Sequence, residues 1–139
     1  MDVYLTLGQV PEDPLDCDTA DGRPATRAAA AAHLARMICA DLETSTEEEQ
    51  HEIALRAAQQ QVRLLLHALD SVTARLPGPP ETVILSGSGE YLGRVVWQAQ
   101  KHCPPCPVVS LDERLWPEIS RAACAHAVAV LAAEGITVS

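Results

Sequence analysis

A short glycine-rich stretch, Gly87-Ser88-Gly89, could bind a ligand through the backbone. It follows the apolar run Thr82–Ser86 and precedes residues with helical patterning, so residues 82–89 are predicted to form a strand and a ligand loop. Glycines let a ligand approach the backbone closely, and the free N–H groups at a helix N-terminus favour an anion or a polar ligand edge. A tight strand-to-helix turn without a ligand explains the same residues.

The same glycines fit a loose dinucleotide-binding pattern. Gly87, Gly89 and Gly93 have the spacing, and Asp112 and Glu113 follow the next predicted strand. That pattern belongs to the first strand of a multi-stranded sheet. Here it comes late in the chain and too little sequence follows it, so we do not favour a Rossmann fold.

A second stretch, within the acidic loop 11–24 and continuing to Arg27, combines carboxylates, hydroxyls and arginines. Its length exceeds that of ordinary connectors, which favours a functional loop. The arginines could bind phosphate and a carboxylate could bind Mg²⁺. The alternative is that Asp21 or Thr26 caps the following helix while the other charges are solvated.

The third stretch is His102-Cys103-Pro104-Pro105-Cys106. A structural zinc site needs four ligands, and the sequence has no second CxxC pair. A thioredoxin-like motif opens a helix, whereas this one follows a helix and enters a strand. We therefore interpret Cys103 and Cys106 as loop cysteines. Cys39 and Cys124 lie among apolar helical positions, which predicts small buried hydrophobes.

The elements that position these stretches follow from hydrophobic spacing. Two overlapping capping boxes, Ser45 with Glu48 and Thr46 with Glu49, mark the start of a long helix. The two apolar strands of the second half are typical of parallel strands covered on both faces, so an α/β fold is expected. The spacing predicts a strand over 3–7, helices over 26–40 and about 46–76, a strand over 82–86, a helix over 90–102, a strand over 107–111 and a helix over 117–134.

Composition limits the classes of partner. The 139 residues carry 10 Lys and Arg against 19 Asp and Glu, a net charge of −9, which argues against nucleic acid and anionic membrane surfaces. No targeting segment or membrane-length apolar run is visible, and the five cysteines cannot all pair, so we expect a cytoplasmic protein. The length predicts a single domain over 1–139. Its alanine-rich core without Phe is thin, as in part of a larger assembly.

Two regions together carry a family resemblance. One comprises Thr19–Arg27 with Leu34–Asp41 and Glu43-Thr44, and the other comprises Ile84–Leu92 with Ser120–Leu131. They resemble the C-terminal part of the hydantoinase/oxoprolinase-like proteins linked to tetrahydromethanopterin-dependent C1 transfer. The resemblance covers nearly the whole chain and less than half of the family's length. It implies the C-terminal lobe of an actin-like (ribonuclease-H-like) fold, with a short parallel sheet and long helices.

The resemblance also implies a function. Archaeal relatives join an aminomethylfuran diphosphate to an amine, γ-glutamyltyramine, with loss of diphosphate, as a step in methanofuran biosynthesis. The family's first half carries a phosphate-binding hairpin, and nothing here corresponds to it. We therefore expect a fragment or truncated form of a two-lobe transferase that is inactive alone. The alternative is a non-catalytic lobe that acts as a binding or dimerisation module.

The predicted site residues combine this match with the chemistry of the acidic loop. The adenosine-type loop of the family corresponds to Gly87, Ser88 and Gly89, and the hinge helix corresponds to residues 117–134, although Trp116 replaces the glycine expected before it. Asp21 is the candidate Mg²⁺ ligand. The expected partners are a phosphorylated small molecule and either a second copy of the chain or the missing N-terminal lobe. The candidate substrate- and phosphate-binding residues are Thr19, Asp21, Gly22, Arg23, Thr26 and Arg27.

Overall fold

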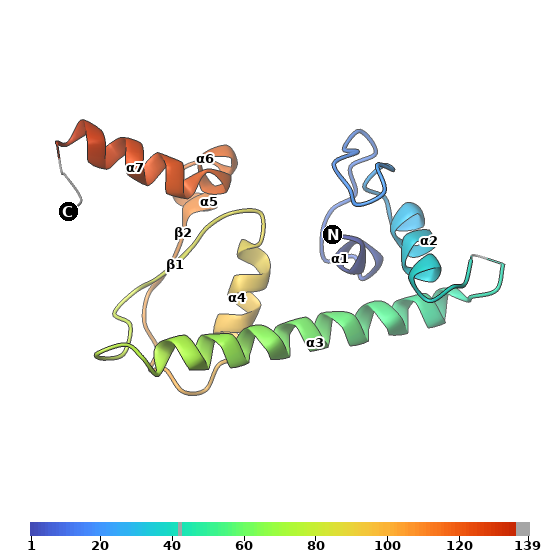
Figure 1. The fold of residues 1–139 in the computed structure, drawn as a ribbon, viewed down its shortest axis with the longest axis horizontal. Coiled ribbons are helices and arrows are strands. Elements are labelled where there is room, and N and C mark those ends of the chain that lie inside the picture. The colour runs from blue at the N-terminus through green and yellow to red at the C-terminus, as the bar shows by residue number, and fades with distance from the viewer. Residues whose placement is uncertain (42, 136–139) are drawn as a thin grey trace. The chain divides into compact units, whose positions relative to one another are not determined.

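A computed structural model describes residues 1–41 and 43–135, which divide into two compact units, Met1–Arg63 and Leu64–Ser139 (Figure 1). The prediction of a single domain stays a prediction. Helix α3 runs through the boundary between them. The elements in chain order are α1 (Asp2–Thr6), α2 (Arg27–Met37), α3 (Glu47–Thr73), β1 (Val83–Leu85), α4 (Glu90–Ala99), β2 (Val108–Ser110), α5 (Leu111–Arg114), α6 (Pro117–Arg121) and α7 (Ala123–Ala133).

The first unit begins with a helix where the sequence predicts a strand over residues 3–7. That prediction is wrong. Five mostly apolar residues are too few to show whether the apolar positions repeat every 2 residues, as in a strand, or every 3.6 residues, as in a helix. The helix buries the adjacent side chains of Tyr4 and Leu5, which a strand would direct to opposite faces. Leu5 packs with Ala25 and Ala30 in the core of this unit.

Helix α2 starts and ends on recognisable capping signals. Thr26 is its N-cap and accepts a hydrogen bond from the N–H of Ala29 at 3.3 Å. At the other end, Cys39 has a φ of 59°, and the N–H of Ala40 donates to the carbonyl of Ala35. This is the Schellman arrangement, in which the chain turns through a left-handed residue. Cys39 is exposed, so the prediction of a buried cysteine is wrong.

One of the two predicted capping boxes forms at the start of α3. The hydroxyl of Thr46 accepts from the N–H of Glu49, and the Glu49 carboxylate accepts from the N–H of Thr46. The box of Ser45 with Glu48 does not form, because the Ser45 hydroxyl donates to the carbonyl of Asp41. The helix ends at Thr73, close to the predicted end.

In the second unit, β1 and β2 pair in parallel, as predicted, with Val83 opposite Val108 and Leu85 opposite Ser110. Helix α4 crosses between them and lies close to β1, since a Cβ atom on Gly93 would be 3.1 Å from Leu85 Cδ2. Within the described residues, Ile84 on the other face of β1 is 64% exposed. The prediction that both faces are covered is therefore wrong for this chain, whose crossover helix covers one side only.

The predicted C-terminal helix over 117–134 is divided in two. Ala122 separates α6 from α7 with a φ of −103° and a ψ of 24°. No residue of α7 is buried, so Cys124 is exposed and the prediction that it is a buried hydrophobe is wrong. Among residues 1–41 and 43–135, no helix combines the length and the apolar character that a membrane span requires.

Candidate functional site

The glycine loop joins the end of β1 to the first turn of α4. Gly87 has a φ of 86°, a conformation that glycine adopts without strain. Its N–H donates a hydrogen bond to Ser120 Oγ at 2.9 Å. A Cβ atom on Gly87 or on Gly89 would meet no atom within 4 Å, and Ser88 is exposed. The loop therefore presents its backbone to the outside, where a ligand edge could reach it.

The carboxylate of Glu90 ties this loop to the elements after β2. Its Oε1 accepts hydrogen bonds from the Ser120 hydroxyl at 2.7 Å and from the N–H of Asp112 at 2.9 Å. Its Oε2 accepts from the Ser110 hydroxyl at 2.5 Å. Ser110 and Ser120 are only 6% and 1% exposed. We call Glu90, Ser110, Ser120 and the Asp112 N–H the Glu90 network.

The environment of Glu90 keeps its carboxyl group ionised at neutral pH. Partial burial raises its pKa, but the hydroxyls of Ser110 and Ser120, the N–H of Asp112 and the charge of Arg94 lower it by more. The pKa is therefore below its ordinary value, and both oxygens act as acceptors.

Sequence reasoning missed the three side chains of this network. A usable signal was present, because Ser110 ends β2 just as the glycine loop follows β1, and the carboxyl ends of parallel strands meet at one edge of a sheet. Ser120 lies in α6 and is 30 residues from Glu90 in the sequence, so no local spacing indicated their hydrogen bond.

The two glycines of the loop are expected to differ in their tolerance of a side chain. Gly87→Ala places a Cβ in a left-handed conformation and should lower the free energy of unfolding by about 1–2 kcal/mol. Gly89→Ala is the matched control, because Gly89 has a φ of −95° and open space around it. Urea unfolding followed by Trp fluorescence measures both, since Trp97 and Trp116 lie in the second unit. Equal losses would contradict the assigned loop conformation.

The predicted phosphate loop lies in the first unit and folds back on itself. The N–H of Gly22, which has a φ of 70°, donates to the carbonyl of Thr19 at 3.2 Å. The Thr19 hydroxyl donates to the carbonyl of Arg23 at 2.7 Å. The N–H of Asp13 donates to the carbonyl of Ala25, which closes the loop at its base.

The loop brings Asp21 together with two arginines. The Asp21 carboxylate accepts from the N–H of Arg23 at 3.2 Å and forms ion pairs with the side chains of Arg23 and Arg36. Desolvation raises the pKa of Asp21, but the Arg23 N–H and the charges of His33, Arg36 and Arg23 lower it by more. Asp21 is thus an anion whose charge these arginines balance.

The other predicted residues of this stretch have separate roles. Thr26 caps α2. The alternative prediction, that this residue caps the following helix, is therefore confirmed. Arg27 forms an ion pair with Glu12 at 3.8 Å, and its N–H donates to the Glu12 carboxylate. The six predicted residues therefore form a turn around Asp21, a helix cap and an ion pair at the start of α2. Binding of phosphate by any of them stays a prediction.

The fit of a magnesium ion at Asp21 is poor. Mg²⁺ takes several oxygen ligands in an octahedral arrangement. Across residues 1–41 and 43–135, no three His, Cys, Asp or Glu side chains are grouped as a metal site would require. The Asp21 carboxylate is already bound to arginine. Magnesium stays a prediction from the sequence, and no step below uses it.

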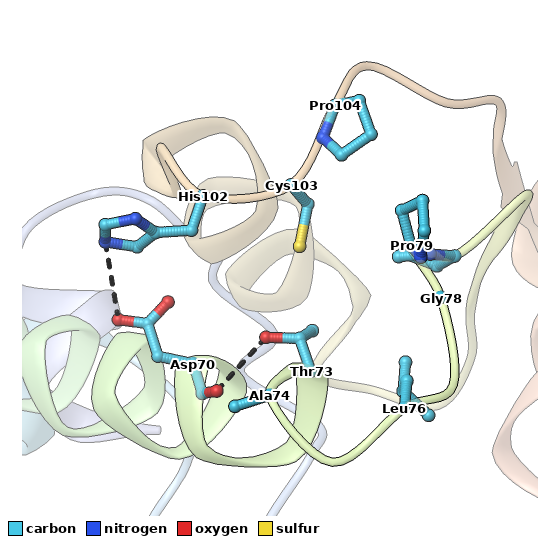
Figure 2. A pocket seen from close by; sticks show the side chains of 10 residues that line it. Asp70, Thr73, Ala74, Leu76, Gly78, Pro79, His102, Cys103 and Pro104 are labelled. Carbon is cyan, nitrogen blue, oxygen red and sulfur yellow. Dashed lines mark hydrogen bonds and ion pairs between the residues drawn. The ribbon is translucent and has the colours of Figure 1, made fainter.

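Residues 102–104, from the segment that contains Cys103 and Cys106, line a cavity of about 360 Å³ in the second unit (Figure 2). His102 Nε2 lies 4.0 Å from Asp70 Oδ2, and the Cys103 thiol points into the cavity. Pro79 and Pro104 contribute apolar surface on the other side. Cys103 and Cys106 are half-buried free thiols on a loop, as expected.

Comparison with known proteins gives one informative similarity. No family model matches the chain. The chain is similar to the (4-{4-[2-(gamma-L-glutamylamino)ethyl]phenoxymethyl}furan-2-yl)methanamine synthase of Methanococcus vannielii, with 23% identity over 130 residues. The aligned region covers 94% of this chain and 58% of that synthase, more than the expected share of less than half. The similarity supports the connection to furan-methanamine synthases, while the actin-like fold stays a prediction.

Proposed function

We propose that this chain is the C-terminal lobe of a transferase of methanofuran biosynthesis. In this proposal, the enzyme joins an aminomethylfuran diphosphate to a phenol-bearing amine and releases diphosphate. The observation that carries the proposal is the similarity to a furan-methanamine synthase over 94% of the chain. The aligned region includes nearly all of the described residues, and it spans little more than half of the relative.

The relative's printed name indicates which atom attacks. A phenoxymethyl group joins a phenol oxygen to the methylene carbon on the furan. We therefore propose the phenol oxygen as the nucleophile, in place of the amine nitrogen expected from the resemblance. A C–O bond forms to the methylene carbon, the C–O bond to diphosphate breaks, and the phenol proton passes to solvent or a base. No oxidation or reduction is involved.

In this reaction the chain would bind and orient the leaving group. The side chains of Arg23 and Arg27 are 57% and 61% exposed, so their guanidinium groups can reach a phosphate in solution. Charge-assisted hydrogen bonds from arginine stabilise the charge that develops on departing diphosphate. The exposed loop Gly87-Ser88-Gly89 before α4 offers a second place for a polar ligand edge.

Deletion of the gene in the source organism tests the proposal. We expect methanofuran to disappear and its furan diphosphate and phenol precursors to accumulate, because no product would form. Mass spectrometry of the cofactor pool measures all three, and restoring the gene on a plasmid is the control. An unchanged methanofuran level would contradict the proposal and favour the second candidate, a non-catalytic lobe that binds or dimerises. The exposed apolar side chains Leu65, Val72 and Ile84 are the observation that favours the second candidate.

A further inference from the structure

A groove of about 500 Å³ lies in the first unit, between the C-terminal end of α2 and the first turns of α3. Both helices and the loop that joins them form its walls. None of its lining residues belongs to the predicted site residues. The lining includes three apolar side chains and three charged ones, namely Ile38, Ala40, Ile53, Glu48, Glu52 and Arg56.

The groove has an exposed apolar surface. Ile38 is the C-cap of α2 and is 52% exposed, and the preceding Met37 is 70% exposed. Ile53 on α3 adds a half-buried side chain. Because the side chain of Glu52 is also 58% exposed, the groove is open to solvent. Small-molecule sites enclose most of their ligand, whereas an open apolar groove suits the apolar face of a helix.

Hydrogen bonds hold the wall between the two helices in place. The Asp41 carboxylate accepts from the N–H of Glu43 at 2.9 Å and from both the N–H and the hydroxyl of Thr44 at 2.8 Å. The Ser45 hydroxyl donates to the carbonyl of Asp41 and accepts from the amide of Gln50 at 2.9 Å. Gln50 is only 4% exposed. This part of the wall is therefore formed before a partner binds, which limits the entropy cost of binding.

The charge around the groove is strongly negative. Residues 41–56 carry six carboxylates and one arginine. Glu49 is used in the capping box and Glu52 pairs with Arg56 at 2.8 Å, whereas the Glu48 carboxylate has no partner within the described residues. The helix dipole accounts for acidic residues in the first turn of α3, but it does not account for the exposed isoleucine beside them.

We propose that this groove binds a basic amphipathic helix of another protein, with the apolar face of that helix on Ile38 and Ile53. Its lysines or arginines pair with Glu48 and Glu52. A second copy of the chain is a poorer occupant, because each copy carries a net charge of −9 and two acidic surfaces repel each other. The proposal does not depend on the transferase function described above, since it uses only this groove.

Fluorescence anisotropy of a labelled peptide with the full chain tests the proposal. The probe is a helical peptide of about 18 leucines and lysines, with the leucines on one face. We expect it to bind at least tenfold more tightly than a peptide of the same composition with scattered leucines, and than a peptide with glutamate in place of lysine. Equal binding of the peptide with scattered leucines would indicate attraction by charge alone and would overturn the proposal. Absence of binding by the probe would overturn it as well.

Substitutions locate the bound peptide. Ile38→Ser should weaken binding at least tenfold, because it removes apolar surface that the peptide covers, and Val128→Ser is the control, since Val128 is 66% exposed in the second unit. Glu48→Gln should weaken binding and reduce its dependence on salt, whereas Glu81→Gln, at an exposed site outside the groove, should change neither. Equal weakening by the controls would overturn the proposal. Loss of self-association in Ile38→Ser with unchanged peptide binding would identify a second copy as the occupant and would also overturn it.

Discussion

Replacing Glu90 with alanine is expected to lower the free energy of unfolding of the second unit by about 2–4 kcal/mol. The substitution removes an acceptor of three hydrogen bonds, and two of its donors are the buried hydroxyls of Ser110 and Ser120. These hydroxyls would lose their acceptor, and their burial limits how well water can replace it. Glu90 itself is half-buried, so solvent weakens part of the effect.

Urea unfolding followed by Trp fluorescence measures this loss. The matched control is Glu113→Ala, because the Glu113 side chain is 75% exposed and pairs with Arg94 on the surface. The control should change stability by no more than about 0.5 kcal/mol. Comparable losses in the two variants would mean that the Glu90 network contributes little.

The effect of Glu90 should also depend on pH in a defined direction. Because the pKa of Glu90 is lowered in the folded chain, its contribution is fully present above the unfolded-state value of about 4.5. The contribution is lost as the pH falls through the lower folded value. The stability difference between the wild type and Glu90→Ala should therefore shrink below pH 4.5. A difference that grew on acidification would contradict the ionised state assigned to Glu90.

Local signals in the sequence were sufficient for most helices and for both central strands. The Thr46 and Glu49 capping box, the proline cluster after the long helix and the apolar run before Gly87 each predict structure within a few residues. These signals are local, because a cap or a strand end is specified by side chains that are close in sequence.

Features that depend on distant contacts could not be predicted in the same way. The N-terminal helix is stabilised by contacts far along the chain, such as the Tyr4 hydroxyl with Gln61 and Asp2 with His33. The Glu90 network likewise joins residues separated by 20 to 30 positions. No pattern of spacing within one element reports such pairs. The sequence therefore predicted the loop Gly87–Gly89 but not the Glu90 carboxylate that ties it to Ser110 and Ser120, and ligand binding by the loop stays a prediction.

Self-association through an apolar face of the second unit is the other large effect that we expect. Leu65 and Val72 are seven residues apart, so they lie on one face of α3, and they are 37% and 59% exposed. Ile84 on β1 is 64% exposed. Leu65 and Val72 thus form an exposed apolar stripe on α3, a feature that marks interaction surfaces, and a second copy of the chain is a self-complementary cover for it. We expect a two-fold dimer that buries more than about 1,000 Å² in total.

Light scattering and sedimentation at several concentrations measure the dimer, and lysine substitutions locate it. Leu65→Lys combined with Val72→Lys replaces the apolar surface that the dimer would bury with two charged side chains in each protomer, which should raise the dissociation constant at least about 100-fold. Leu64→Lys is the control, because Leu64 is 61% exposed but points about 100° away from Leu65 around the helix. A monomer at high micromolar concentration would contradict the dimer. The face of Leu65 and Val72 is the one expected to be buried between the two copies. An equal rise in the dissociation constant on Leu64→Lys would show that the interface is not on this face.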